Sequence, residues 1–187
     1  MLSYLPMMFD VSGKKLLIVG GGAIAHEKLS RICDLDCDIS VVAVEFSHDM
    51  LRLMEQKNIP YTIREYRSID LEDISIVIAA TDDQELQKRI FSEASAKKIL
   101  CNSVDLAESC HFIFPSVIRR GDFILSVSTS GASPAFAKYF KKYLENILPN
   151  DIEDFLKNMK ETRTRLPKGK ERMALLDEMA RKYFDPL

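Results

Sequence analysis

The chain has 187 residues, of which 47% are hydrophobic and 29% are charged, and its formal net charge is −2 at pH 7. A chain of this length and composition can bury a globular core, and its locally basic middle segment suits an anionic ligand better than a nucleic-acid duplex. No apolar run approaches the roughly 20 residues of a membrane span, and the apolar residues 1–9 lack the basic start of a signal peptide. We therefore expect a cytoplasmic protein with no membrane and no nucleic-acid partner.

The cysteines favour a reducing compartment over a metal centre. None of them forms a Cys-x-x-Cys pair, and only three histidines are available to complete a zinc site. We expect free thiols in a reducing compartment. The cysteines are Cys33, Cys37, Cys101 and Cys110.

A glycine-rich turn lies near the start of the chain. Residues 15–19 predict a buried strand, and apolar residues at helical spacing predict a helix over 23–35. The sequence between them reads Gly20-x-Gly22-x-x-Ala25, a form of the dinucleotide-binding fingerprint. Gly20 permits a tight turn, Gly22 lets a pyrophosphate approach the backbone, and Ala25 lets the helix pack closely on the strand. The alternative is a bare turn without a ligand.

Strands and helices continue to alternate after this unit. A chain with this alternation over residues 15–105 is expected to form an α/β fold with a Rossmann-like, doubly wound parallel sheet. The further predicted elements are strands over 39–44, 61–66, 74–80 and 99–103 and helices over 47–57 and 84–98.

Polar residues follow several of the predicted strands, where an open parallel sheet binds its ligands. Glu45 lies about where this fold places an acid for the adenosine ribose hydroxyls, which favours NAD over NADP. The alternative is a solvated acid in a loop. Thr81 and Asp82 follow the strand over 74–80, whereas Asp83 is also explained as a helix cap. The predicted cofactor contacts are Gly20, Gly22, Ala23, Ile24, Val44, Glu45, Thr81, Asp82 and Asn102.

After the fifth strand the pattern changes. Runs over 112–115 and 123–127 predict two strands joined by a turn over 119–122. A serine-rich loop then leads to a helix capped by Ser133, and two further helices follow. Residues 115–150 carry five Lys/Arg and two Asp/Glu, a balance that suits an anionic ligand.

These patterns predict three parts. Residues 1–111 form an NAD-binding Rossmann domain, residues 112–149 a small α+β dimerisation segment and residues 150–187 a helical C-terminal domain. The middle part has too little sheet to bury both of its apolar faces, so we expect it to pair with a second copy in a homodimer.

Five segments occur in an order and spacing that resemble one family. They are residues 17–25, 78–83, 101–105, 112–116 and 127–134. The chain resembles the precorrin-2 dehydrogenase family, the NAD-binding module of siroheme synthases, whose bifunctional members are also sirohydrochlorin ferrochelatases. The resemblance implies a homodimer that oxidises precorrin-2 with NAD to sirohydrochlorin. Whether the chain also inserts ferrous iron (Fe²⁺) to give siroheme stays open.

The resemblance assigns the catalytic role to the aspartate after the fifth strand, here Asp105. Such a carboxylate takes a ring proton as hydride leaves, and can strip pyrrole protons before iron binds; the alternative is a loop cap. His111 is either a ligand that guides iron or an ordinary residue before a strand. The predicted substrate contacts are Ser128, Thr129, Ser130, Arg119, Arg120 and Lys138, and Lys141 and Lys142 add positive charge.

The serine-rich loop differs from the family pattern. Relatives have Ser-Ser-Gly-Gly-x-Ser-Pro, whereas residues 128–134 read Ser-Thr-Ser-Gly-Ala-Ser-Pro, so that Ser130 replaces a glycine. The position phosphorylated in some relatives is Thr129 here, and whether it is modified stays open. The loop opens a helix, so its N–H groups can hold a substrate carboxylate. Each basic residue nearby is equally explained as a solvated surface charge.

One function from another class competes with the enzyme. A Rossmann domain can bind NAD(H) without catalysis and change its contacts with a partner as a regulatory sensor. The segments over 112–115 and 133–134 argue against this alternative. An assay for tetrapyrrole binding, together with a partner screen, distinguishes the two.

Overall fold

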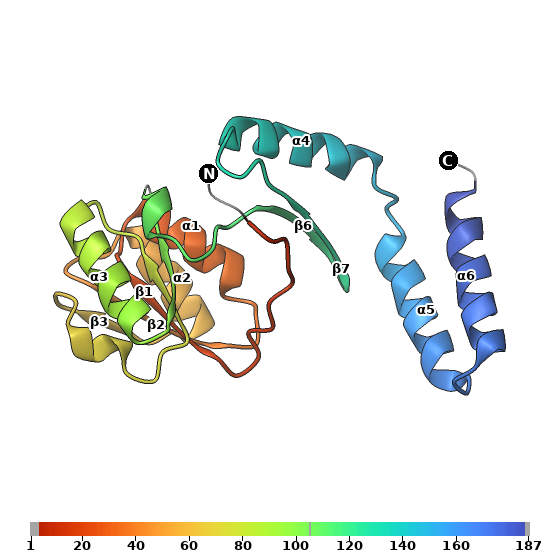
Figure 1. Ribbon diagram of the computed structural model, residues 1–187, viewed down its shortest axis with the longest axis horizontal. Coiled ribbons are helices and arrows are strands. Elements are labelled where there is room, and N and C mark those ends of the chain that lie inside the picture. The colour runs from red at the N-terminus through yellow and green to blue at the C-terminus, as the bar shows by residue number, and fades with distance from the viewer. Residues whose placement is uncertain (1–3, 105, 186–187) are drawn as a thin grey trace. The chain divides into compact units, whose positions relative to one another are not determined.

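The computed structural model describes residues 4–104 and 106–185 (Figure 1). The chain divides into two compact units, Met1–Ile113 and Phe114–Leu187, and each is described by itself. The first unit extends two residues beyond the NAD-binding domain expected from the sequence. The second holds the C-terminal helices and the expected dimerisation segment without its residues 112–113.

The first unit is a five-stranded parallel sheet in the order β3-β2-β1-β4-β5. The strands are β1 (Lys15–Val19), β2 (Asp38–Ala43), β3 (Tyr61–Ile63), β4 (Ile76–Ala79) and β5 (Leu100–Ser103). The helices are α1 (Ala23–Ile32), α2 (His48–Lys57) and α3 (Gln84–Ala96), and two short 3-10 helices are η1 (Ser68–Leu71) and η2 (Ala107–Ser109). The order reverses between β1 and β4, which confirms the Rossmann-like, doubly wound fold.

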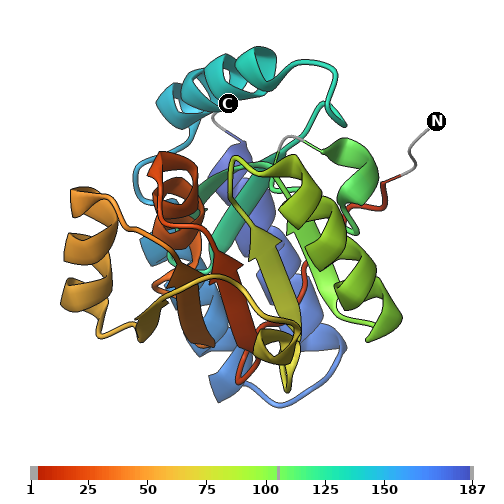
Figure 2. The same ribbon diagram turned by 90° about the vertical axis from the view of Figure 1, so that its left-hand side faces the viewer.

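Helices cover both faces of this sheet (Figure 2). The connections from β1 through β3 carry α1 and α2, which pack together. The strands β4 and β5 extend the sheet on the other side of β1, and α3, which connects them, packs on both. The core under α3 includes Leu17, Val77, Ile90 and Ala94. Every residue of β4 is buried, as expected for a strand covered on both faces.

Side-chain caps fix where two of these helices begin. Ser47 Oγ accepts a hydrogen bond from the Met50 N–H at 3.3 Å. Asp83 Oδ1 accepts from the N–H groups of Glu85 at 3.0 Å and Leu86 at 3.1 Å. These bonds confirm the helix start expected at residue 47 and the capping explanation of Asp83.

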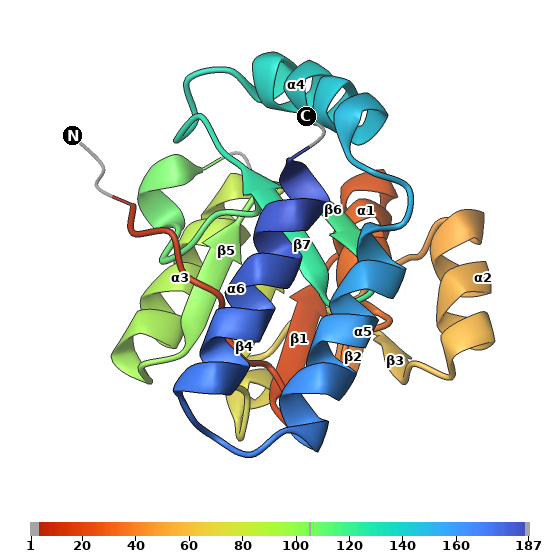
Figure 3. The same ribbon diagram turned by 90° about the vertical axis from the view of Figure 1, so that its right-hand side faces the viewer.

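The second unit consists of an antiparallel ribbon and three helices. The ribbon pairs β6 (Ser116–Arg120) with β7 (Phe123–Val127), and α4 (Pro134–Ile147), α5 (Ile152–Arg165) and α6 (Lys170–Phe184) follow. α4 packs on the ribbon, and α5 and α6 lie side by side (Figure 3). Stacked rings of Phe155 and Tyr183, with centroids 3.9 Å apart, join these two helices. Within the described residues of both units, no helix is long and apolar enough to cross a membrane.

The ribbon begins later than the sequence predicted. Residues 112–115 were expected to form a strand, but β6 begins at Ser116, after a proline that has no N–H for a strand ladder. The turn was predicted over residues 119–122, but residues 119–120 belong to β6. The first half of that prediction is therefore wrong. A two-residue turn over 121–122 remains, and its glycine has φ +55°, a left-handed conformation that glycine adopts readily.

Candidate functional site

The turn between β1 and α1 has the geometry that the glycine motif requires. Gly20 has φ +129°, and a Cβ there would lie 2.6 Å from the carbonyl carbon of Ala80 and nearer still to its oxygen. Only glycine fits such a position. A Cβ on Gly22 would meet no described atom within 4 Å, so this position leaves room for a ligand group beside the backbone.

Gly21, which the motif leaves variable, is as restricted as Gly20. A Cβ on Gly21 would press on the carbonyl of Glu45 and lie 2.7 Å from Phe46 Cδ1. The Gly21 carbonyl also accepts a hydrogen bond from the Ser47 N–H at 2.9 Å. The glycine turn therefore packs directly on the segment after β2. Sequence reasoning missed this contact. Its one signal was the middle glycine of the run, which the motif does not require.

A cavity of about 840 Å³ opens at the carboxyl ends of β1, β2 and β4. Its volume falls in the usual range of small-molecule sites, roughly 300–1,000 Å³. The predicted cofactor residues that line it are Gly20, Gly22, Ala23, Ile24, Val44, Glu45, Thr81 and Asp82. Lining residues that sequence reasoning missed include Arg64, Glu65, Tyr66, Glu85, Leu86 and Arg89.

The N-terminus of α1 faces this cavity without a local anion. Gly22 is the N-cap, no side chain in the described chain caps the helix, and its first turn holds no acidic residue. The backbone N–H groups of Ala23 and Ile24, which both line the cavity, therefore remain available. Free N–H groups and the positive end of the helix dipole favour a phosphate at this place.

The edge of the cavity after β4 is held by a buried glutamine. Gln87 is 1% exposed, and its Nε2 donates a 2.6 Å hydrogen bond to the carbonyl of Thr81. Its Oε1 is buried without a partner among the described groups. Asp83 N–H donates to Thr81 Oγ1 at 3.3 Å, while the Asp82 side chain stays exposed. Thr81 is thus fixed on both sides, and the exposed Asp82 lines the cavity beside it.

A carboxylate and an arginine that follow neighbouring strands both line the cavity. Glu45 is exposed, and Arg64 follows β3, the neighbour of β2. Arg64 Nη1 and Nη2 donate to the two carboxylate oxygens of Asp70 at 2.7 Å and 2.6 Å. Burial raises the pKa of Asp70, but the bonds from Arg64 and from the Arg67 N–H outweigh burial and hold that pKa below its ordinary value.

A second ion pair lies behind Tyr66. Tyr66 O–H donates to Glu93 Oε2 at 2.7 Å, and Ser68 Oγ and Arg89 Nε donate to Glu93 Oε1 at 2.9 Å and 3.1 Å. The Arg89 guanidinium lies over the Tyr66 ring, 5.2 Å from its centroid. Burial raises the pKa of Tyr66, and its bond to Glu93 raises it further. Both arginines of the cavity are therefore paired with carboxylates.

Two predicted residues are engaged in the fold of the first unit. Asn102 is buried and its Nδ2 donates to the carbonyl of Phe112 at 2.9 Å; it does not line the cavity. His111 Nδ1 accepts a 3.0 Å bond from the Cys101 N–H, and its Nε2 lies 3.2 Å from Ser95 Oγ. Both ring nitrogens of His111 are thus in use.

The described part of the chain contains no cluster of metal-ligating side chains. There, no three side chains of His, Cys, Asp or Glu gather where they could hold a metal ion. Asp105, the predicted catalytic residue, lies outside the described residues.

The predicted substrate residues all belong to the second unit, where one arginine is structural. Arg120 donates from Nη1 to the Pro149 carbonyl at 2.8 Å and from Nη2 to the Glu145 carbonyl at 3.1 Å, at the end of α4. Arg119 and Lys138 are exposed and remain available to an anion.

The serine-rich loop is shaped by its own side chains. Ser128 Oγ accepts from the Ser130 N–H at 3.1 Å, and Thr129 Oγ1 accepts from the Ser133 N–H at 3.0 Å. Ser133 Oγ in turn caps α4 by accepting from the Phe136 N–H at 3.1 Å, as predicted. Ser130 has φ +51°, a left-handed conformation in which glycine would be unstrained.

Comparison with known proteins agrees with the fold and the cavity. Residues 7–116 match a family described as "Putative NAD(P)-binding". This match includes the glycine turn and every residue that lines the cavity.

Relatives and a solved structure match over more of the chain. The chain is 35% identical over 151 residues to siroheme synthase 1 of Serratia proteamaculans and 33% identical over 153 residues to a siroheme synthase of Neisseria meningitidis serogroup C. These matches cover 81% and 82% of this chain but only 32% of each relative, so the chain spans about a third of their length. The structure of SirC, a precorrin-2 dehydrogenase, is similar with a TM-score of 0.79 and 25% identity, over 94% of this chain and 89% of that one.

Proposed function

The chain belongs to this NAD(P)-binding family, and we propose that it oxidises precorrin-2 to sirohydrochlorin with NAD as the hydride acceptor. The observation that carries the proposal is the cavity, which brings an uncapped helix terminus and Glu45 to one space of cofactor size. The likeness to a precorrin-2 dehydrogenase over nearly the whole chain supports the choice of substrate.

The residues of the cavity suit the parts of NAD. The first-turn N–H groups of α1 bind the pyrophosphate, which approaches the backbone at Gly22. Glu45 accepts hydrogen bonds from the adenosine ribose hydroxyls. Thr81, held by Gln87, forms the edge beyond β4 and orients the reactive end of the cofactor. NAD, when bound, supplies the acceptor for the hydride that leaves the tetrapyrrole.

The proton and the substrate carboxylates require further residues. We assign proton removal to Asp105, which comes two residues after the end of β5, so that a carboxylate accepts the ring proton as the hydride departs. Arg119, Lys138 and the loop over 128–130 bind the carboxylates of precorrin-2. Arg120 serves in the proposal only to hold α4 in place, because its guanidinium already binds backbone carbonyls.

Fe²⁺ is the substrate of a second proposed step, insertion into sirohydrochlorin, which the name of the siroheme synthase relatives supports. The ring nitrogens of the tetrapyrrole coordinate the metal, so the protein needs a base more than a ligand cage. Asp105 is suited to that role. For His111 to guide iron, its Nε2 would first have to leave Ser95.

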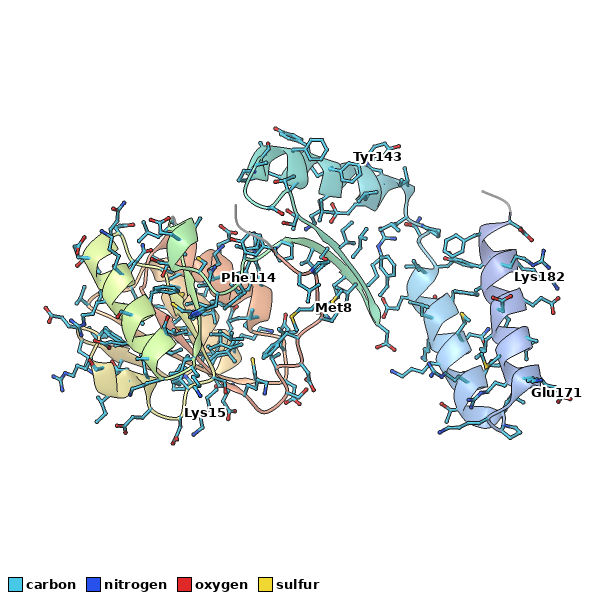
Figure 4. The ribbon with its side chains drawn as sticks, in the orientation of Figure 1. Met8, Lys15, Phe114, Tyr143, Glu171 and Lys182 are labelled. Atoms are coloured by element: carbon cyan, nitrogen blue, oxygen red, sulfur yellow. The ribbon has the colours of Figure 1, made fainter. Side chains whose placement is uncertain are left out.

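We propose that α4 mediates the homodimer. One face of α4 carries exposed apolar residues. The rings of Phe136, Phe140 and Tyr143 stack along the helix, and Tyr143 points away from the ribbon (Figure 4). The exposed apolar residues of this face are Phe136, Tyr139, Phe140, Tyr143 and Ile147. A second copy that covers this face would remove it from water. Light scattering at micromolar concentration should give twice the 21.3 kDa of the chain, and a mass of 21.3 kDa would contradict the dimer.

Anaerobic absorbance spectroscopy tests the reaction. Enzymatically made precorrin-2, NAD⁺ and the purified protein should together produce the sirohydrochlorin spectrum, and omission of either the protein or NAD⁺ should abolish it. Asp105→Asn should bind NAD⁺ and lose the reaction. NAD⁺ binding without any turnover by the unmutated protein would favour a regulatory sensor.

The four free thiols fit a reducing compartment, and we place the reaction in the cytoplasm.

A further inference from the structure

The cofactor cavity contains both residue types by which dinucleotide folds select NAD or NADP. An acid near the end of the second strand binds the free ribose hydroxyls of NAD, whereas a nearby arginine accommodates the 2′-phosphate of NADP. Glu45 and Arg64 both line the cavity. The identity of these two residues alone therefore does not decide which dinucleotide the cavity takes.

Glu45 and Arg64 follow two strands, β2 and β3, that pair in parallel. Ala43 pairs with Ile63, and the Arg64 N–H continues the ladder with a 2.9 Å hydrogen bond to the Ala43 carbonyl. Two residues beyond Ala43 the chain reaches Glu45, so the acid and the arginine follow the ends of adjacent strands and line one cavity. A 2′-phosphate bound near Glu45 would thus lie within the reach of an unpaired arginine.

Asp70 keeps Arg64 from acting on such a phosphate. Both terminal nitrogens of Arg64 bind the Asp70 carboxylate, and Nη1 also donates to the Glu65 carbonyl at 2.9 Å. The Asp70 side chain is 8% exposed against 32% for Arg64, and the Arg67 N–H holds it at 2.8 Å. The carboxylate is therefore the fixed member of the pair and the guanidinium is its bound partner.

We propose that Asp70 is a specificity-determining residue: by occupying both terminal nitrogens of Arg64 it denies a 2′-phosphate its partner and leaves Glu45 to select NAD. The inference rests on the proposed use of NAD by this cavity. Arg89, the other arginine that lines the cavity, is bound at Nε by Glu93, and its guanidinium lies over the Tyr66 ring.

Calorimetric titration of the full chain with adenosine 5′-monophosphate and adenosine 2′,5′-bisphosphate tests the proposal. The two probes differ only by the 2′-phosphate, and neither requires the tetrapyrrole or turnover. The unmutated protein should prefer the monophosphate. Asp70→Asn should improve the affinity for the bisphosphate about tenfold or more, because a charged fork becomes available, and change the affinity for the monophosphate little.

Two further variants provide matched controls. Arg64→Met added to Asp70→Asn should abolish the gain. Asp73→Asn removes the same charge from an exposed site, 86% accessible, and should leave the preference unchanged. A gain that survives without Arg64, or a folded Asp70→Asn protein with an unchanged preference, would overturn the proposal.

Arg64→Met alone keeps the proposal testable if Asp70→Asn does not fold. Because Arg64 is already withheld, its removal should leave the relative affinity for the two probes unchanged. A selective loss of bisphosphate affinity would show that Arg64 was free to bind phosphate, and would overturn the inference. Binding of monophosphate without dehydrogenation would instead contradict the proposed function while leaving the nucleotide preference in place. If neither probe bound the unmutated protein, both proposals would fail.

Discussion

The glycine turn makes a prediction that separates stability from cofactor binding. Gly21 and Gly22 are adjacent, and the same added methyl group meets different surroundings at each. At Gly21 a Cβ would lie 3.0 Å from the carbonyl carbon of Glu45, nearer still to the oxygen, and 2.7 Å from Phe46 Cδ1. At Gly22 it would meet nothing in the described structure within 4 Å.

The expected magnitudes follow from these contacts. The carbonyl of Glu45 belongs to the backbone and cannot rotate away, so we expect Gly21→Ala to destabilise the first unit by about 1–3 kcal/mol, as overpacking generally does. For a chain of this size that corresponds to a fall in melting temperature of about 2–12 °C. Gly22→Ala changes only an N-cap and should cost under about 1 kcal/mol, yet its methyl group stands where the pyrophosphate approaches.

Differential scanning calorimetry and NAD⁺ titration distinguish the two variants. Gly22→Ala should unfold near the temperature of the unmutated protein and lose about tenfold or more of its NAD⁺ affinity. Gly21→Ala should unfold earlier. The reasoning is refuted if Gly21→Ala proves as stable as the unmutated protein, or if Gly22→Ala binds NAD⁺ normally.

Three further predictions concern single residues. Arg120→Met should lower the free energy of unfolding of the second unit by about 1.5–3 kcal/mol, because carbonyls at the end of α4 lose charged donors. Urea unfolding measures this loss, and the matched change Arg119→Met, at an exposed site, should leave the free energy of unfolding unchanged. Ser130→Gly should raise stability in the same assay by about 0.5–1 kcal/mol, since it removes a left-handed non-glycine residue; a decrease would contradict the strain. The pKa of Asp70 is lowered by folding, so its contribution to stability is fully present well above the ordinary pKa of 3.8 and is lost as the pH falls below that value. Between pH 3 and 7 the free energy of unfolding of Asp70→Asn should therefore change less with pH than that of the unmutated protein. An equal pH dependence in the two proteins would argue against a lowered pKa of Asp70.

The sequence predicted the elements whose signals are local. The run over 15–19 and the glycines after it are adjacent in the chain, and so are Ser47, Asp83 and the helices that they cap. Strand burial follows from the same local signal, because a continuous apolar run fits only a position covered on both faces. These features determined the fold class and most of the cavity wall.

What the sequence did not reveal depends on contacts between distant segments. Gly21 is restricted by Glu45, Thr81 is held by a glutamine on α3, and Arg64 is bound by Asp70 of η1. None of these pairs follows a periodic pattern, so hydrophobic spacing could not identify them. Arg120 was expected at the substrate because its charge was visible and its carbonyl partners were not.

The acidic lining of the cavity bears on how the proposed reaction ends. Glu45, Glu65, Asp82, Asp83 and Glu85 all line it, and its two arginines are already paired. NADH carries one more negative charge than NAD⁺, so this acidic lining would hold the reduced cofactor less tightly than the oxidised one. Bound NAD⁺ would then be a weaker oxidant than free NAD⁺, and the release of NADH would favour the forward reaction. The acidic lining would thus also limit inhibition of the protein by its own product.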